Sequence, residues 1–461
     1  MRWFVALAVV FGLSAPGMTA DAPPDWKAGV ATVDVTPDKP MWMAGYASRT
    51  KPAEGTAQNL FAKALALEDA GGTRVVIVTL DLISIPRVLR DHLEAVARDK
   101  YRLPPEGLML NCSHTHCGPE LRAAEITRLD DAPERGKLAA DYARKLETQL
   151  ADLIGAALKD LAPAKLTYTH ARCGFAMNRR LPEANGWSNN PNPEGPVDHD
   201  VPVLRADGAD GKPRAVLFGY ACHNTTLAFY QWCGDYAGFA QDFIQRSNPG
   251  AVALFVAGCG GDQNPYPRGT LDQARQHGEA LGNAVAAALR TRPRPIRGPL
   301  RAAIDQAVVD YAAPLPTKDE LLKRKQTSRD AYDRNHAERL LKHLEDNGKL
   351  PTSYSAPVQA VRLGDDLLLV ALPGETVVDY SLRLKKELAG SGPAVWVAGY
   401  SNDVFTYLPS LRVLKEGGYE GGGAMKYSTY PHPNLFAETV EDRIVGKARE
   451  LVDRTAKPAQ K

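Results

Sequence analysis

The chain has 461 residues, 44% of them hydrophobic, which suits one large globular core or two smaller ones. Its 56 lysine and arginine residues nearly balance 54 aspartate and glutamate residues. Charge therefore gives no reason to expect nucleic acid or an anionic membrane surface as a partner. No internal stretch is apolar for long enough to span a bilayer, so we expect no transmembrane segment.

The first twenty residues predict a cleaved signal peptide. Arg2 precedes an apolar block over residues 3–13, and small residues follow as far as Ala20. The block is too short for a membrane anchor, although a retained N-terminal helix is the alternative. We therefore expect a secreted or periplasmic protein whose mature part is one domain over residues 25–456.

Strand-like and helix-like patterns alternate along the mature chain. Apolar runs rich in β-branched residues predict strands, and apolar residues at helical spacing predict helices. The expected strands cover 74–82, 108–110, 214–220, 253–257, 367–372 and 394–400. The expected helices cover 86–98, 137–161, 271–289 and the stretch before Leu388, with a charge-dense, solvent-facing helical excursion over 318–347. This alternation predicts an α/β fold, a single catalytic domain with layered mixed sheets flanked by helices.

Six cysteines in an exported chain permit up to three disulfides. Cys112 and Cys117 bracket a short loop, and a disulfide between them would brace it. Small buried thiols are the alternative, and for Cys222 and Cys259 this alternative is at least as good. None of the six lies in a context typical of a thiolate nucleophile.

The run from Cys112 to Pro119 contains two histidines at His-x-His spacing. His114 and His116 project to the same side of an extended segment, because side chains alternate there with period two. A short buried strand precedes them, and neutral imidazole is the commonest metal ligand in proteins. The pair predicts half of a metal site. Two histidines that bind only loop backbone are the alternative.

Other predicted strands also end at residues suited to metal binding or catalysis. In chain order these are His223, the turn Gly260–Asp262, Glu375 and, after the last strand, Tyr407. Ligands collect at such strand ends in open α/β sheets. Two imidazoles, a carboxylate and one further oxygen donor match a hydrolytic zinc site with room for a water. Taken singly, a core histidine, an acid at a helix N-terminus and a core tyrosine would explain the same residues.

Several short motifs occur in one order over nearly all of the mature chain. The most specific are the string Ser-His-Thr-His-Cys-Gly-Pro over 113–119 and Tyr407 followed twelve residues later by Tyr419-Glu420-Gly421. The others are Gly29–Pro37 with Gly45-Tyr46, Asn178-Arg179, Ala221–His223, Gly234–Ala240 and Pro373–Glu375. In these motifs the chain resembles the N-terminal catalytic domain of the neutral/alkaline (non-lysosomal) ceramidase family.

The resemblance implies a zinc site and names its residues by position. The implied ligands are His114, His223, Glu375 and Tyr407. The residues that match the lining of the catalytic centre are His116, Arg179 and Tyr419. Arg179 and Tyr419 would stabilise the reacting amide carbonyl. His116 would pass a proton to the leaving amine, or would orient a metal ligand instead.

The sequence departs from the family at two places. The family's Gly-Asp-x-Ser-Pro turn supplies an active-site serine, whereas the turn here ends in Gln263-Asn264-Pro265. Asn264 forms hydrogen bonds but is no nucleophile, so we expect it to position substrate while zinc-activated water attacks the amide. Family members also continue into an immunoglobulin-like domain, and this chain stops at Lys461, so we expect a divergent member without that domain.

The expected function is that of a secreted zinc-dependent amidohydrolase. Its substrate would be an N-acyl amide, either ceramide or a related N-acyl lipid. The partners would be a small-molecule or lipid amide and, for a lipid, a transient contact with a membrane surface. A zinc hydrolase of the same fold that acts on a non-lipid amide or ester is one alternative. A non-catalytic binding protein that has kept the fold is another.

Overall fold

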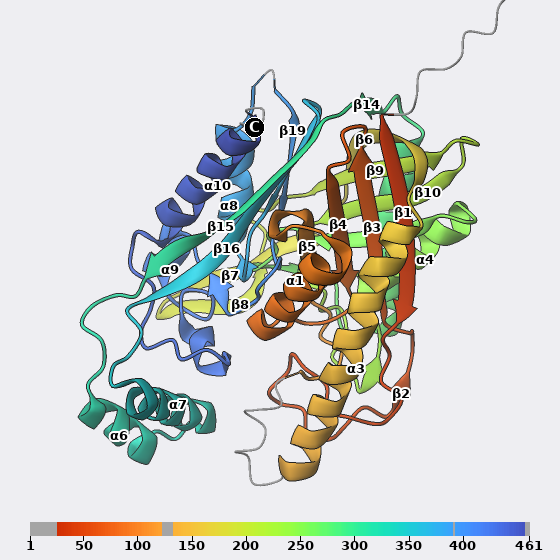
Figure 1. The fold of residues 1–461 in the computed structure, drawn as a ribbon. Helices are drawn as coiled ribbons and strands as arrows, with labels where there is room; N and C mark the ends of the chain where they lie inside the picture. Colours follow the sequence, from red (N-terminus) through yellow and green to blue (C-terminus); the bar gives the residue numbers. More distant parts are fainter. Residues whose placement is uncertain (1–24, 122–131, 391, 457–461) are drawn as a thin grey trace, which may run out of the picture.

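A computed structural model describes residues 25–121, 132–390 and 392–456, and the predicted signal peptide lies outside these residues. Two large β-sheets form the centre of the structure, and helices cover their outer faces (Figure 1). Within the described residues, no helix combines the length and the apolar character that a membrane span needs. The α/β class expected from the sequence is confirmed.

The larger sheet has nine strands and mixed direction. In spatial order they are β12 (Val252–Ala257), β10 (Pro213–Tyr220), β9 (Asp200–Gly208), β6 (Ala162–Arg172), β1 (Trp26–Asp34), β3 (Phe61–Asp69), β4 (Arg74–Leu80) and β5 (Leu108–Cys112), with β14 (Arg294–Ile296) paired to β6. The pairs β10/β12 and β4/β5 are parallel, and the other pairs are antiparallel. Buried apolar runs in β4, β5, β10 and β12 explain why the sequence predicts these strands best.

The second sheet has four strands, β15 (Leu300–Asp310), β16 (Ser353–Leu363), β17 (Leu367–Ala371) and β19 (Ala394–Ala398). The two sheets pack face to face through an apolar cluster to which both contribute. They approach closely at Gly219, where a Cβ atom would lie 2.8 Å from the ring of Trp396. The small sheets are β2 (Gly55–Thr56) with β11 (Gln231–Trp232), β7 (Ala176–Glu183) with β8 (Gly186–Asn192) and β13 (Gln263–Pro265), and β18 (Glu375–Thr376) with β20 (Tyr407–Leu408).

Helices complete the layers on both sides of the paired sheets (Figure 1). The nine-stranded sheet is covered by α1 (Arg87–Tyr101), α3 (Ala132–Lys159), α4 (Asp235–Ser247) and α5 (Leu271–Leu289). The four-stranded sheet is covered by α8 (Val378–Glu387), α9 (Leu411–Glu416) and α10 (Val440–Ala456). Two 3₁₀ turns, η1 (Pro105–Gly107) and η2 (Gly423–Tyr427), lie in the connections. The hairpin of α6 (Lys318–Thr327) and α7 (Ala331–Asn347) stands apart from these layers.

The predicted elements are confirmed, and the structure adds helices α4, α9 and α10, which were not expected. The excursion over 318–347 is two helices, and the second has one face that does not point to solvent, as shown below. Several strands were not expected. Parts of β1, β6, β15 and β16 are only half-buried or exposed and carry polar residues, which weakens the apolar pattern, while β3 is mostly buried but includes Lys63, Glu68 and Asp69.

Of the two alternatives for the cysteines, the structure shows buried thiols: all six cysteines are free, and Cys112 and Cys117 form no disulfide. The two thiols point to different neighbours. The Sγ atom of Cys112 lies 3.5 Å from the carbonyl oxygen of Ile83, and that of Cys117 lies 3.9 Å from the carbonyl oxygen of Leu227.

Candidate metal centre

The predicted metal ligands come from four segments that end at one place between the two sheets. His114 follows β5, His223 follows β10, Glu375 begins β18 and Tyr407 begins β20. Strands β18 and β20 run parallel, with Glu375 directly opposite Tyr407. The tight turn before Glu375 requires glycine, because Gly374 has φ +69° and a Cβ there would lie 2.7 Å from the carbonyl oxygen of Thr406. The strand ends thus meet as the sequence predicts.

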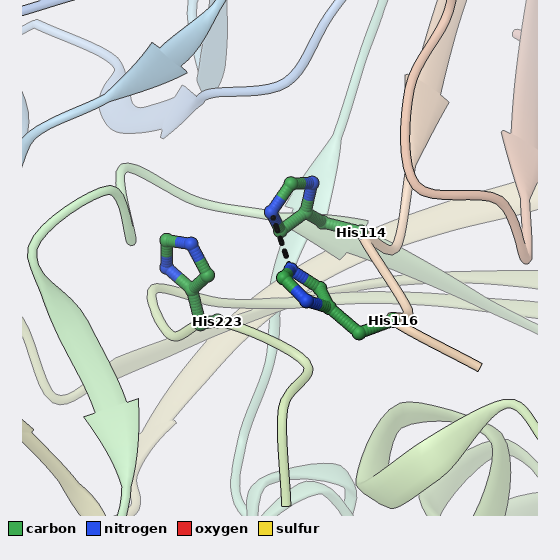
Figure 2. A group of neighbouring side chains, drawn as sticks. All are labelled: His114, His116 and His223. Atoms are coloured by element: carbon green, nitrogen blue, oxygen red, sulfur yellow. Dashed lines mark hydrogen bonds between the residues drawn. The ribbon is translucent and has the colours of Figure 1, made fainter. Parts of the chain in front are cut away.

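Three imidazoles lie together at this place. The rings of His114, His116 and His223 face one another, and one nitrogen of each lies within 4.8 Å of the others (Figure 2). The Nε2 atoms of His114 and His116 are 3.1 Å apart. His114 has left-handed backbone with φ 58°, an uncommon conformation for this residue that turns its ring toward the cluster. Such a group of side chains is able to hold a metal ion.

Backbone carbonyls fix which nitrogen of two imidazoles carries the proton. The Nδ1 atom of His114 lies 2.6 Å from the carbonyl oxygen of Ile83, and that of His223 lies 2.7 Å from the carbonyl oxygen of Gly260. A carbonyl only accepts, so each Nδ1 donates and each Nε2 keeps its lone pair. Both Nε2 atoms lie 3.1 Å from the Oε2 atom of Glu375.

Neither His114 nor His223 therefore donates to the Glu375 oxygen that lies between their Nε2 atoms. Burial and the nearby Arg179 cation lower the pKa of His223 to about 3, so this imidazole is neutral at neutral pH. Two lone pairs and a carboxylate oxygen at these distances fit a divalent cation with nitrogen and oxygen ligands.

His116 has a different environment from the other two imidazoles. Its ring packs against Tyr46, with ring centroids 4.8 Å apart, and against Gly45, where a Cβ would lie 2.5 Å from the ring. Its Nδ1 atom is buried and has no hydrogen-bond partner among the described residues. Burial, followed by the two neighbouring imidazoles, holds its pKa well below the usual range. A neutral imidazole with one free nitrogen is suited to proton transfer as well as to metal binding.

Tyr407 and Arg179 form the other side of the cluster. The hydroxyl oxygen of Tyr407 lies 3.1 Å from the Nε2 atom of His223 and accepts a hydrogen bond of 2.7 Å from the Nη2 atom of Arg179. Burial raises the pKa of Tyr407 well above its usual range despite the Arg179 cation. Arg179 is buried and does not line the cavity described below, so it contacts Tyr407 rather than the space in front of the cluster.

Arg179 is held by two further residues. Its Nε atom donates to Glu420 at 2.8 Å, and its Nη1 atom donates to Asn264 at 3.3 Å. Asn264 is fully buried and also accepts from the hydroxyl of Thr225 at 3.3 Å. Asn264 thus lies behind Arg179 and outside the cavity lining, which differs from the expected position in contact with substrate.

Glu420 has no role in the sequence prediction, although it belongs to the motif Tyr419-Glu420-Gly421. Glu420 accepts from Arg179 and, at 2.6 Å, from Arg180, and both arginines are buried. The sequence signal for Glu420 is its place directly after Tyr419, a candidate site residue. Its partners lie about 240 residues earlier in the chain, so spacing alone does not connect them.

A cavity of about 370 Å³ lies in front of the cluster. His114, His116, Glu375, Tyr407 and Tyr419 line one part of it. Tyr419 is 43% exposed, and its ring centroid lies 5.3 Å from that of Tyr407, so Tyr419 borders the cluster and solvent together. The volume lies at the lower end of the range for small-molecule pockets. Much of the remaining lining comes from the loop around Trp42 and Tyr46, from segments 83–86, 404–406 and 426–430, and from α7, and Glu120, Leu121, Arg135 and Ala424 also contribute.

The geometry agrees with comparisons with known proteins. Over 252 residues the chain is 25% identical to neutral ceramidase B from Dictyostelium discoideum, covering 49% of this chain and 33% of that protein. The chain thus spans about a third of the length of this curated relative. Crystallographic neutral ceramidase from Pseudomonas aeruginosa matches at a TM-score of 0.72 and 20% identity, covering 95% of this chain and 76% of that chain.

A second solved structure, a ceramidase complexed with C2, matches at a TM-score of 0.70 and 18% identity, covering 95% of this chain and 77% of that chain. At these identities the two structures establish the fold. The sequence model of the neutral/alkaline non-lysosomal ceramidase N-terminal domain matches residues 26–303, more than half of the chain. The chain therefore belongs to the neutral/alkaline non-lysosomal ceramidase family.

Proposed function

We propose that this protein is a zinc-dependent amidohydrolase that cleaves an N-acyl amide, either ceramide or a related N-acyl lipid. The observation that carries the proposal is the group of acceptors formed by His114, His223 and Glu375, in which two lone pairs face one carboxylate oxygen at 3.1 Å. The names of the relatives support the amide as substrate. The apolar block over residues 3–13 supports export.

In this proposal His114, His223, Glu375 and Tyr407 hold the zinc. A zinc ion supplies charge that polarises the amide carbonyl and lowers the pKa of a water molecule. Zinc bound by two imidazoles, one carboxylate and one phenol oxygen is closer to a hydrolytic site than to a closed structural site. Backbone carbonyls that fix the Nδ1 protons of both histidines hold the two Nε2 atoms in place for the metal.

The other site residues transfer a proton, stabilise the carbonyl oxygen and position Tyr407. His116, whose Nδ1 atom is free, passes a proton to the leaving amine. Tyr419 borders the cavity, and its hydroxyl stabilises the negative charge that develops on the carbonyl oxygen. Arg179 donates to Tyr407 and so acts through that ligand, while Asn264 and Glu420 hold Arg179 in position.

A hydrolysis assay tests the proposal. The chain is freed of metal with a chelator, reloaded with zinc, and incubated with N-acylsphingosine, N-acylethanolamine, N-acyl amino acids and acetylated amino sugars. We expect release of fatty acid from at least one N-acyl lipid only after zinc is returned. An exposed histidine outside the cluster provides the control, since His170→Ala should leave this activity unchanged. Hydrolysis that persists in the metal-free chain would contradict the proposal.

A further inference from the structure

Helix α7 contributes one face to the same cavity as the candidate metal ligands. Tyr332, Asn335 and Arg339 all line it. They are spaced i, i+3 and i+7, so they lie on one face of the helix. The opposite face packs on α6 through Leu340 and Leu321. The cavity face of α7 is thus a defined surface that the proposed reaction does not use.

Asn335 is the unsatisfied group on this face. The residue is half-buried, and its side chain has no hydrogen-bond partner among the residues that the structure describes. An asparagine amide offers two donors and an acceptor with two lone pairs. A polar group at a cavity wall that lacks a protein partner is satisfied by water or by a polar group of the ligand.

Several contacts fix the position of α7 against the cavity wall. The Nη2 atom of Arg339 donates to the carbonyl oxygens of Lys426 and Ser428 at 3.0 and 2.9 Å. The Nε2 atom of His336 lies 2.9 Å from the carbonyl oxygen of His432, and Arg324 donates to its Nδ1 atom. The cavity face of α7 is thus held by backbone contacts on segment 426–432. The backbone that carries Asn335 is therefore fixed at the cavity wall, which lowers the ordering cost of a contact with a ligand.

The two charged side chains on this wall, Lys426 and Arg339, already have partners. Lys426 forms an ion pair with Asp330, and Arg339 is engaged with two carbonyls. A neutral amide pairs best with a neutral donor and acceptor such as a hydroxyl. Tyr332 is 37% exposed, and its ring contacts that of Tyr427, which adds an aromatic edge where the cavity meets solvent.

We propose that Asn335 is a specificity-determining residue that hydrogen-bonds a hydroxyl group of an N-acyl substrate, while the ring of Tyr332 contacts the apolar chain of that substrate. This inference rests on the proposed function. It predicts that the protein distinguishes amides that differ by one hydroxyl, because a site built to pair a hydroxyl leaves its own polar group unpaired when the hydroxyl is missing.

The test compares two amides of nearly equal size. N-lauroylethanolamine ends in a hydroxyl, and N-propyldodecanamide has a methyl group in its place. The zinc-loaded full chain is assayed as wild type, as Asn335→Leu, which keeps the volume, and as Asn335→Ala, which adds no bulk. We expect both substitutions to raise KM for the ethanolamide roughly tenfold, with little change in kcat and little change for the propylamide.

Glu338→Gln is the matched control, because Glu338 lies on the same helix, pairs with Lys325 of α6 and does not line the cavity. It should change neither substrate. Equal loss for the two amides in the Asn335 variants would mean that Asn335 has a structural role and would overturn the inference, as would no change for either amide.

Binding measurements separate this inference from the proposed function. Calorimetry on the chelator-treated full chain gives the affinity for each amide without any reaction. Weaker binding of the ethanolamide alone in Asn335→Leu supports the inference even if no variant shows zinc-dependent hydrolysis. Equal affinity of the wild type for the two amides overturns it, whatever the hydrolysis assay shows.

Discussion

The two sides of the cavity are built in different ways. On the strand-end side, His114, His223 and Glu375 follow strands or begin them, and buried hydrogen bonds from Nδ1 to backbone carbonyls hold both imidazole rings. On the α7 side, the lining residues stand on a helical hairpin outside the main layers, attached to the body through segment 426–432 (Figure 1).

Under the proposed function, this difference assigns chemistry to one side of the cavity and selectivity to the other. Metal ligands need fixed positions, and groups at the ends of buried strands provide them. A peripheral hairpin tolerates sequence change at small cost to the core, and so it is a suitable place for residues that choose the substrate. Changes on the strand-end side should therefore affect metal binding and turnover, and changes on the α7 side should affect affinity for substrate.

Removal of a ligand on the strand-end side should have the largest effect. We expect His223→Ala to abolish stoichiometric zinc binding and to lower turnover by about 10³ or more, because the metal supplies most of the polarisation of the amide. Elemental analysis of the purified chain, with about one zinc per wild-type chain, measures the first effect. Undiminished zinc in both His114→Ala and His223→Ala would contradict the ligand assignment.

Glu420→Gln should have the next largest effect. The carboxylate pairs with Arg179 and Arg180, and these two charges hold its pKa below the usual range although burial alone would raise it. A neutral amide there would leave Arg179 without a carboxylate partner, while Arg180 keeps Glu416, and would release Arg179 from Tyr407. We expect zinc affinity, measured by competition with a chelating dye, to fall by roughly 10- to 100-fold.

Glu416→Gln is the matched control for this substitution. Glu416 pairs with Arg180 and with Arg412 but not with Arg179. The zinc affinity of the Glu416→Gln variant should stay within a factor of about two of the wild type, because the hydrogen bond from Arg179 to Tyr407 is intact. Equal losses of affinity in the two variants would show that the network stabilises the fold in general rather than the ligand.

The sequence predicts the strand-end side well and the α7 side poorly, for a physical reason. A buried apolar run followed by a histidine predicts a strand and also predicts where that strand ends. This holds for β5 before His114 and for β10 before His223, because one local pattern carries both predictions. The helix over 271–289 forms with the predicted bounds, and in the structure a capping box at Thr270 begins it.

Tertiary contacts decide the rest. The charge-dense pattern of α7 predicts a helix, but it does not show which face meets a cavity, because polar residues line both the cavity and the solvent side. The position of Asn264 also depends on tertiary contacts. Its replacement of the family serine indicates a changed position, and only the fold shows that the amide contacts Arg179 behind the cluster.

Stability should depend on pH through Asp235, which supports the loop that carries His223. Asp235 is buried, accepts from the backbone N–H of Leu227 at 2.9 Å, and has its pKa raised to about 6 by burial. The folded state therefore binds this proton more tightly than the unfolded state. Its stabilising contribution is complete below about pH 4 and is lost as the pH rises through 6, a loss of about 2–3 kcal/mol.

Asp235→Asn should flatten this dependence, because asparagine stays neutral and tolerates the left-handed backbone there, with φ 54°. Denaturant unfolding of the metal-free chain between pH 4 and 8 measures it. Asp198 should make stability depend on pH in the opposite direction, because Lys385 holds the pKa of Asp198 below its usual range despite burial. Its stabilising contribution is lost as the pH falls. Asp198→Asn should remove that dependence. The same pH profile in both variants would contradict the assignment.

The smallest effect on global stability should come from the α7 side. Lys426→Gln removes the ion pair with Asp330 that links the start of α7 to η2, and both side chains are about a third exposed. Such a pair contributes about 0.2–1 kcal/mol, so the unfolding midpoint should hardly move. Local opening of the hairpin is a separate event from global unfolding, and we expect hydrogen exchange of the α7 amides to become severalfold faster while β5 and β10 stay protected.

Lys325→Gln is the control, because it removes an exposed ion pair with Glu338 within the hairpin and should leave the attachment to η2 intact. Equal acceleration of exchange in α7, β5 and β10 would mean that the two sides of the cavity open together, and the separation between fixed chemistry and peripheral selectivity would then be wrong.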